Sequence, residues 1–208
     1  MNKIYNILLV SLILAATIVG IMIAVKYGRN YINEQEIKET VAEIEENLEN
    51  SKNGEKIQSV YKGYAIEGIL EIPKIEIKYP IIIDTTEETM KISITKFWGP
   101  EEPNEIGNYT IAGHNNRDGT MFGKTKYLQK GDILKLTNLN NIVVNYRIFD
   151  IYSVNPNDTS YVKSIEEGAR EVTLITCTKG HEERLIIKAR EEKNIWWGEI
   201  FFESEIRL

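Results

Sequence analysis

The sequence has little of the two residue types that most often build metal sites and cross-links. Cys177 is the only cysteine, which excludes an intramolecular disulfide framework and a cysteine-based zinc cluster within one chain. The only two histidines are His114 and His181, so a histidine-rich metal site is not expected either. The 31 acidic residues leave a carboxylate-only calcium site open. We predict no metal and no cofactor.

The sequence also lacks an excess of positive charge. It has 25 lysines and arginines, a net charge of -6 and a pI near 5.2. It shows no basic stripe with interleaved aromatic residues, so nucleic acid is not an expected partner. At 208 residues the chain has room for one domain with its own core and a short attached segment.

The first feature that stands out is an uncharged apolar run from Ile4 to Val25. This run is long enough to cross a bilayer core of roughly 30 Å as a helix, so we predict a membrane anchor over residues 1–26. A cleaved signal peptide is the alternative, but here the apolar residues continue past Ala15 and Ala16 to Ile23. Basic residues flank both ends, so charge alone does not orient the helix.

A second helix is predicted from Tyr31 to Asn50. Its apolar residues recur at spacings of four, three and four, and glutamates fill the other faces. The apolar positions are Ile37, Val41, Ile44 and Leu48. We interpret residues 27–60 as an acidic helical stalk and linker whose apolar stripe could rest on the main domain. The polar stretch from Ser51 to Lys56 is the expected turn before that domain.

The remaining residues, 61–208, are dominated by short segments rich in β-branched residues and separated by turn formers. The predicted strands are Ile66–Ile72, Ile75–Ile83, Tyr109–Ala112, Ile133–Thr137, Val143–Val154, Val172–Thr176 and Leu185–Ala189. The predicted short helices are Thr86–Ile94, Ser164–Ala169 and Thr120–Leu128. This pattern favours a mainly β fold, a closed barrel of about eight strands with a few short helices.

Cys177 ends the predicted strand VTLITC and is followed by a polar loop. A lone cysteine is often a small buried hydrophobe, and that interpretation needs no chemistry. A free thiol with a pKa near 8.5 is only about 3% thiolate at pH 7, so a cysteine nucleophile needs a cationic neighbour. The candidates are His114 and Arg184.

His114 lies in YTIAGHNN, just past a predicted strand. Cysteine paired with a histidine distant in sequence is the arrangement that acyl-transfer chemistry uses. Arg184 opens the strand RLIIKAR, so a tight loop could return its guanidinium to the sulfur, where it could serve an oxyanion. A salt bridge at the barrel rim is the alternative for Arg184. His181, in the middle of the loop, is expected to be exposed.

These motifs resemble those of the sortases, the cysteine transpeptidases that attach surface proteins to Gram-positive cell walls. TLITC, ending at Cys177, resembles the family's TLxTC strand, and IAGHN, with His114, resembles its AGH segment. Arg184 stands where the family's arginine belongs. The resemblance extends over most of Gly68 to Arg190 and is nearest to class A and D members. Asp84, Asn115, Asn116 and the short loop after Cys177 depart from the family pattern, which leaves the subclass and the substrate motif open.

The resemblance implies a transpeptidase that cleaves an LPxTG-like sorting signal. Cys177 would form a thioester, His114 would move protons and Arg184 would stabilise the oxyanion. Ala112 and Thr176 are predicted to contact the substrate. The partners would be surface proteins with a C-terminal sorting signal and an amine of a peptidoglycan precursor or cross-bridge. The enzyme would be a single-pass membrane protein with its barrel on the wall side.

The sequence leaves three alternatives to a sortase that attaches proteins to the wall. A pilin-polymerising sortase often adds a C-terminal anchor and a lid with a DPx motif; we find neither, and the aromatic tail from Lys193 is too short and too charged to span a bilayer. A hydrolytic cysteine peptidase would replace the amine by water. A tethered β-barrel that binds a surface ligand would do no chemistry, and Cys177 would be packing.

Overall fold

The computed structural model describes residues 2–51, 56–164, 166–178, 180 and 182–192. His181 and the aromatic tail from Lys193 lie outside the described residues. The chain forms two compact units, residues 1–40 and 41–208.

The first helix, α1 (Asn2–Asn50), is continuous through both helical segments that the sequence predicts. No proline interrupts it, and the apolar side chains from Ile4 to Val25 are exposed. Its apolar part has a mean hydropathy of 2.9, so α1 is long and apolar enough to cross a membrane. A membrane anchor therefore fits this helix by length and composition.

The last turns of α1 belong to the second unit and pack there. Val41, Ile44 and Leu48 are buried, which places the apolar stripe of the helix against the barrel. Glu45 forms an ion pair with Lys78 of the barrel at 2.5 Å. This part of the predicted stalk is thus a packed helix, with only its acidic faces in solvent.

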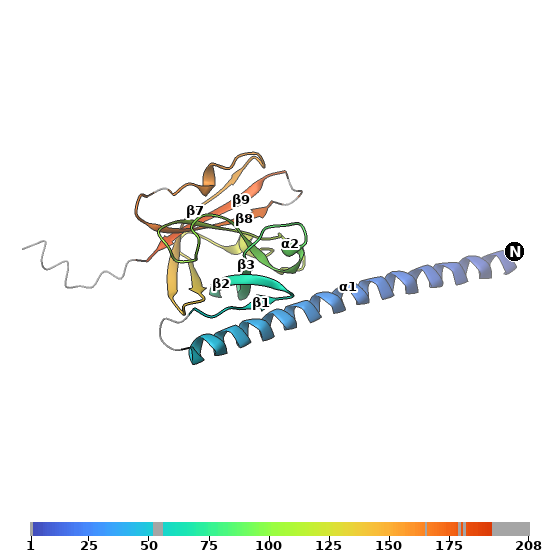
Figure 1. The fold of residues 1–208 in the computed structure, drawn as a ribbon. Helices are drawn as coiled ribbons and strands as arrows, with labels where there is room; N and C mark the ends of the chain where they lie inside the picture. The colour runs from blue at the N-terminus through green and yellow to red at the C-terminus, as the bar shows by residue number, and fades with distance from the viewer. Residues whose placement is uncertain (1, 52–55, 165, 179, 181, 193–208) are drawn as a thin grey trace, which may run out of the picture. The chain divides into compact units, whose positions relative to one another are not determined.

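The rest of the second unit is a β-barrel (Figure 1). Its strands are β1 (Val60–Tyr61), β2 (Tyr64–Ile72), β3 (Ile77–Ile82), β4 (Ile94–Trp98), β5 (Gly107–Ala112), β6 (Ile133–Asn138), β7 (Val143–Val154), β8 (Arg170–Cys177) and β9 (Arg184–Glu191). The short helices are η1 (Pro73–Ile75), α2 (Thr89–Ile92), η2 (Thr125–Tyr127) and η3 (Ser160–Val162).

Pairing between β2 and β6 closes the barrel. The strand order is β2-β3-β4-β5-β8-β9-β7-β6, with the short β1 added at the outside of β2. Gly68 of β2 faces Asn138 of β6, and a Cβ at this glycine would lie 2.3 Å from the carbonyl oxygen of Thr137. Only glycine allows the two strands to approach this closely. The closed barrel of eight strands confirms the fold expected from the sequence.

The predicted helices need correction. The segment Thr86–Ile94 contains only the single turn α2, and Ile94 already begins β4, a strand that the sequence analysis missed. Within Ser164–Ala169 the described residues form no helix, and the helical turn comes earlier, at η3. In Thr120–Leu128 only η2 is helical. Tertiary packing and side-chain hydrogen bonds overrode weak local propensities in these short segments.

The strands β5, β8 and β9 lie side by side and alternate between two faces. On one face the side chains are buried in the barrel, as Tyr109, Leu174 and Ile187 are. On the other face the side chains meet the connection between β7 and β8. This second face carries Cys177 and Arg184 at one end of the strands.

Candidate active site

Cys177 and Arg184 are joined by the β8–β9 hairpin. Cys177 is the last residue of β8 and pairs with Arg184, the first residue of β9. The hairpin is closed by Thr178, whose N–H donates to the carbonyl oxygen of Glu183 at 2.9 Å. Arg184 Nη1 donates to Cys177 Sγ at 2.9 Å. The guanidinium, which the sequence placed one loop away, is thus in hydrogen-bond contact with the sulfur.

His114 lies just past the end of β5, beside the end of β8. The residue before it, Gly113, donates its N–H to the carbonyl oxygen of Ile175 and accepts a hydrogen bond from Thr176 Oγ1. The residue after it, Asn115, donates from Nδ2 to the carbonyl oxygen of Cys177 at 2.7 Å. Both neighbours of His114 are therefore bound to the last residues of β8. The strand β5, which ends two residues before His114, is parallel to β8, which ends at Cys177.

Ala112 and Thr176 were predicted to contact the substrate. Ala112 pairs with Ile175 across the two parallel strands and is almost fully buried. Thr176 is also buried, and its hydroxyl donates a hydrogen bond to the carbonyl oxygen of Gly113. Both residues support the backbone next to His114 and Cys177, and a substrate contact by either remains a prediction.

Asn115 makes a contact with Cys177 that the sequence does not predict. It was noted only as a departure from a family pattern, yet its amide ties the segment after His114 to the backbone of Cys177. Nothing in the sequence indicates this bond, because residues 115 and 177 meet only once β5 and β8 pair in parallel register.

A small apolar cluster lies on the same face as the cysteine. Ile175 of β8 and Ile186 of β9 are two residues from Cys177 and Arg184, respectively, and both pack with Tyr161 of η3. Tyr152 and Val154 of β7 pack against this cluster. Burial raises the pKa of the Tyr161 hydroxyl, and the nearby Arg184 opposes this shift. The strand face that ends in Cys177 and Arg184 thus also carries an apolar wall formed by η3 and three strands.

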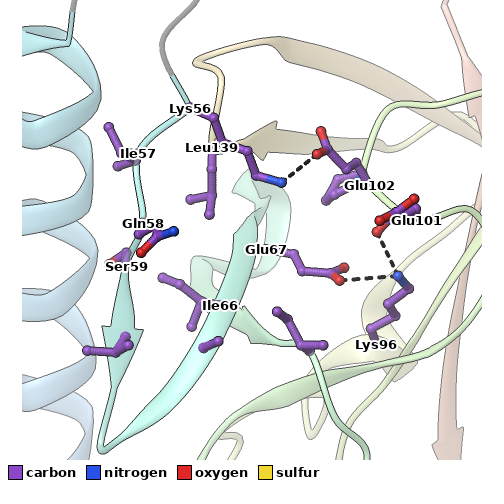
Figure 2. A pocket seen from close by; sticks show the side chains of 14 residues that line it. Lys56, Ile57, Gln58, Ser59, Ile66, Glu67, Lys96, Glu101, Glu102 and Leu139 are labelled. Atoms are coloured by element: carbon purple, nitrogen blue, oxygen red, sulfur yellow. Dashed lines mark hydrogen bonds and ion pairs between the residues drawn. The ribbon is translucent and has the colours of Figure 1, made fainter.

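A cavity of about 620 Å³ lies elsewhere in the barrel (Figure 2). It is lined mainly by β2, by the segment from Lys56 to Val60 and by the loop before β5, and none of His114, Cys177 and Arg184 lines it. Its lysines are paired, Lys96 with Glu67 at 3.1 Å and Lys56 with Glu102 at 2.5 Å. This cavity is therefore separate from the candidate site at Cys177.

No group of three or more histidine, cysteine, aspartate or glutamate side chains is placed to hold a metal ion within the described part of the chain.

The barrel resembles a family of known proteins. The model of the sortase domain matches residues 70–192. Sortase D of Bacillus subtilis (strain 168) is 34% identical over 110 residues, which cover 53% of this chain and 53% of that protein. Sortase A of Staphylococcus aureus (strain NCTC 8325 / PS 47) is 24% identical over 214 residues, covering 99% of this chain and 98% of that protein. The match thus spans about half of the first relative and nearly all of the second.

Solved structures show the same fold. A Clostridium perfringens sortase D5 transpeptidase aligns with a TM-score of 0.57 and 25% identity, over 78% of this chain and 99% of that one. Sortase A of Listeria monocytogenes aligns with a TM-score of 0.55 and 23% identity, over 62% of this chain and 88% of that one. The matched residues 70–192 include His114, Cys177 and Arg184, and with the eight-stranded barrel they show that the chain belongs to the sortase family.

Proposed function

We propose that this protein is a membrane-anchored transpeptidase that cleaves an LPxTG-like sorting signal and joins the released carbonyl to a cell-wall amine. The observation that carries the proposal is the 2.9 Å contact between Arg184 Nη1 and Cys177 Sγ at the end of paired strands. A cysteine used only for packing has no need of a guanidinium at its sulfur, whereas a nucleophile and the oxyanion that it creates both benefit from one.

In the first half-reaction, the Cys177 thiol gives its proton to His114, and the thiolate attacks the carbonyl carbon of the scissile peptide bond. Arg184 donates hydrogen bonds as negative charge develops on the carbonyl oxygen. The C–N bond then breaks, and His114 gives a proton to the departing amine. The product is a thioester between the substrate and Cys177.

In the second half-reaction, an amine of a peptidoglycan precursor or cross-bridge attacks the thioester carbonyl. His114 accepts the proton of that amine, the C–S bond breaks and a new amide bond forms. Cys177 is released as it began, so no oxidant, cofactor or external energy source enters the cycle.

The proposed division of the chain follows from this role. Residues 1–26 would anchor the protein in the membrane, residues 27–60 would link the anchor to the enzyme, and residues 61–208 would form the catalytic domain on the wall side. The length and apolar character of α1 support the anchor, because a helix of this kind is costly to leave in water.

The test uses the full chain purified in detergent micelles with an LPxTG-type peptide, with and without triglycine as the amine. We expect a peptide–triglycine product, and an acyl adduct on Cys177 by mass spectrometry when triglycine is left out. Cys177→Ala should give neither. A product released only by water would favour the hydrolytic peptidase, and the absence of any Cys177 adduct with the host's sorting-signal peptides would refute the proposal.

A further inference from the structure

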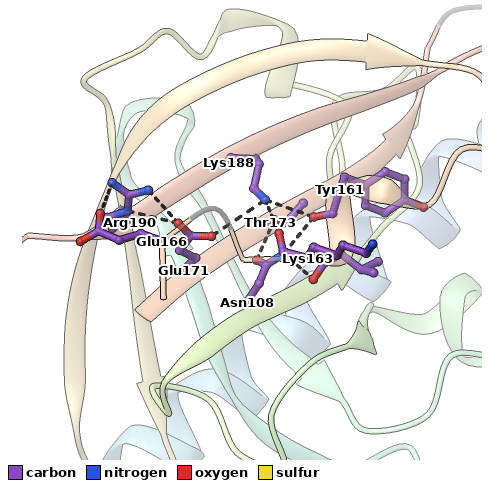
Figure 3. A network of polar contacts seen from close by, with 9 residues as sticks. Asn108, Tyr161, Lys163, Glu166, Glu171, Thr173, Lys188 and Arg190 are labelled. Carbon is purple, nitrogen blue, oxygen red and sulfur yellow. Dashed lines mark hydrogen bonds and ion pairs between the residues drawn. The ribbon is translucent and has the colours of Figure 1, made fainter. Parts of the chain in front are cut away.

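Lys188 is a buried cation that binds the backbone of the β7–β8 connection. It lies in the middle of β9, and only 1% of its surface is exposed. Its ammonium donates to the carbonyl oxygens of Lys163, at 2.8 Å, and Tyr161, at 3.2 Å (Figure 3). A buried ammonium is costly unless its hydrogen bonds are made, so these carbonyls fix both Lys188 and the turn that carries them.

Asn108 of β5 binds the same turn from the neighbouring strand. Its Nδ2 donates to the carbonyl oxygens of Tyr161, at 2.9 Å, and Val162, at 3.0 Å. Its Oδ1 accepts a hydrogen bond from Thr173 Oγ1 of β8, which fixes the orientation of the amide. Two strands thus hold three successive carbonyl groups at the end of η3.

A carboxylate balances the buried charge. Glu171 of β8 lies 3.9 Å from the Lys188 ammonium and also accepts a hydrogen bond from Arg190 at 2.8 Å. Arg190 in turn pairs with Glu166 of the β7–β8 connection at 2.6 Å. Burial lowers the pKa of Lys188, and Glu171 opposes that shift. The network therefore connects the barrel strands to the connection at two points (Figure 3).

The turn that this network holds is η3, and its Tyr161 is part of the apolar wall on the strand face of Cys177. The Tyr161 side chain packs on Ile175 and Ile186, which precede Cys177 and follow Arg184 by two residues on the same strand faces. A shift of the Tyr161 backbone would move this apolar wall without touching Cys177 or Arg184. The geometry points to Lys188 as a positioning residue that sets the wall against which the acyl-donor peptide lies.

This inference rests on the proposed function, because it concerns how the peptide substrate is held. An apolar residue could fill the space of Lys188 in the strand, but it would leave the carbonyl of Lys163 without this donor and the Tyr161 carbonyl with Asn108 alone. A buried polar network whose hydrogen bonds are all made favours a single conformation. Here the network holds the conformation of η3.

The experiment measures thioester formation by full-length Lys188→Met with an LPxTG-type peptide in single turnover. We expect the KM for the peptide to rise about tenfold and the maximal acylation rate to fall by less than about threefold. The reason is that the substitution weakens peptide binding to the apolar wall and leaves Cys177 and Arg184 in place. The rate at which iodoacetamide alkylates Cys177 should not change. Lys135→Met, on the exposed side of β6, is the matched control and should match the wild type.

Asn108→Ala is the second variant, because it removes the other donor to the same turn without altering charge. It should raise the KM in the same way, and the double variant should raise it by less than the product of the two single effects, because both residues hold one element. An unchanged KM in both single variants would refute the inference, as would a parallel fall in maximal rate and iodoacetamide reactivity.

Failure of both variants to fold would make the network a folding requirement and would also refute the positioning role. A wild-type protein that forms no thioester refutes the proposed function itself. An active wild type with unchanged KM in the variants refutes this inference alone.

Discussion

Arg184 and Cys177 face each other as a cross-strand pair, and the guanidinium donates to the sulfur over 2.9 Å. In the proposed mechanism, this geometry would put a permanent cation where the thiolate and then the substrate oxyanion carry charge.

Replacing Arg184 should therefore slow acylation far more than it weakens peptide binding. For Arg184→Ala we expect a fall of about 10²- to 10³-fold in the single-turnover acylation rate, the usual effect of removing an oxyanion donor. Arg184→Lys should restore little, because a single ammonium on a flexible stem does not reproduce the planar fork. Arg147→Ala, which removes an exposed arginine of β7, is the control. A loss in Arg184→Ala no larger than in the control would contradict the assigned role.

Asn115 should contribute to the rate by holding the cysteine backbone. Asn115→Ala removes the hydrogen bond to the carbonyl oxygen of Cys177, and a bond of this kind is worth about 0.5–1.5 kcal/mol. We expect the acylation rate to fall by up to about tenfold with little change in KM. Asn116→Ala is the control, since the amide of Asn116 binds Thr120 instead. Equal effects of the two substitutions would show that the contact with Cys177 is not what matters.

The sequence predicted the barrel because its strands are marked by β-branched residues and bounded by turn formers. It missed β4, whose segment ITKFW was partly assigned to a helix and carries an exposed Phe97 and Trp98. A five-residue strand that pairs in parallel with β3 depends on tertiary contacts more than on local pattern.

The part of the candidate site that lies at the ends of predicted strands could be predicted from the sequence. The residues at 114, 177 and 184 are linked by chain order and by one short loop. Asn115 and Lys188 were not predictable, because the amide of Asn115 meets Cys177 across 62 positions of sequence. In the strand RLIIKAR, alternation alone does not show that a connection covers the face of Lys188 and buries its ammonium.

Gly113 is expected to be sensitive to any side chain. An added Cβ would lie 2.8 Å from Phe122 Cδ2 and 3.0 Å from Ile94 Cγ2, and both neighbours are fully buried. Gly113→Ala should reduce the free energy of unfolding by about 1–3 kcal/mol and slow acylation by displacing His114. Thermal unfolding and single-turnover acylation would measure the two effects. Gly28→Ala, where the Cβ meets open space in α1, should neither lower the free energy of unfolding nor slow acylation. An unaltered Gly113→Ala protein would contradict the packing at this position.

Tyr109 should make the fold sensitive to alkali. Burial, followed by the charge of Glu67, raises the pKa of its hydroxyl well above the ordinary value of 10.0, and the hydroxyl donates to Glu67 Oε2 at 2.5 Å. Above pH 10 the unfolded chain releases this proton while the folded protein keeps it, so the free energy of unfolding falls as the pH rises from 10 toward the folded-state pKa. Tyr109→Phe should cost about 1–2 kcal/mol at pH 7 for the lost hydrogen bond, yet lose less stability between pH 10 and 11. Urea unfolding at pH 7, 9, 10 and 11 would measure this, with Tyr127→Phe, an exposed tyrosine, as the control. Parallel pH curves for Tyr109→Phe and the wild type would contradict the assignment.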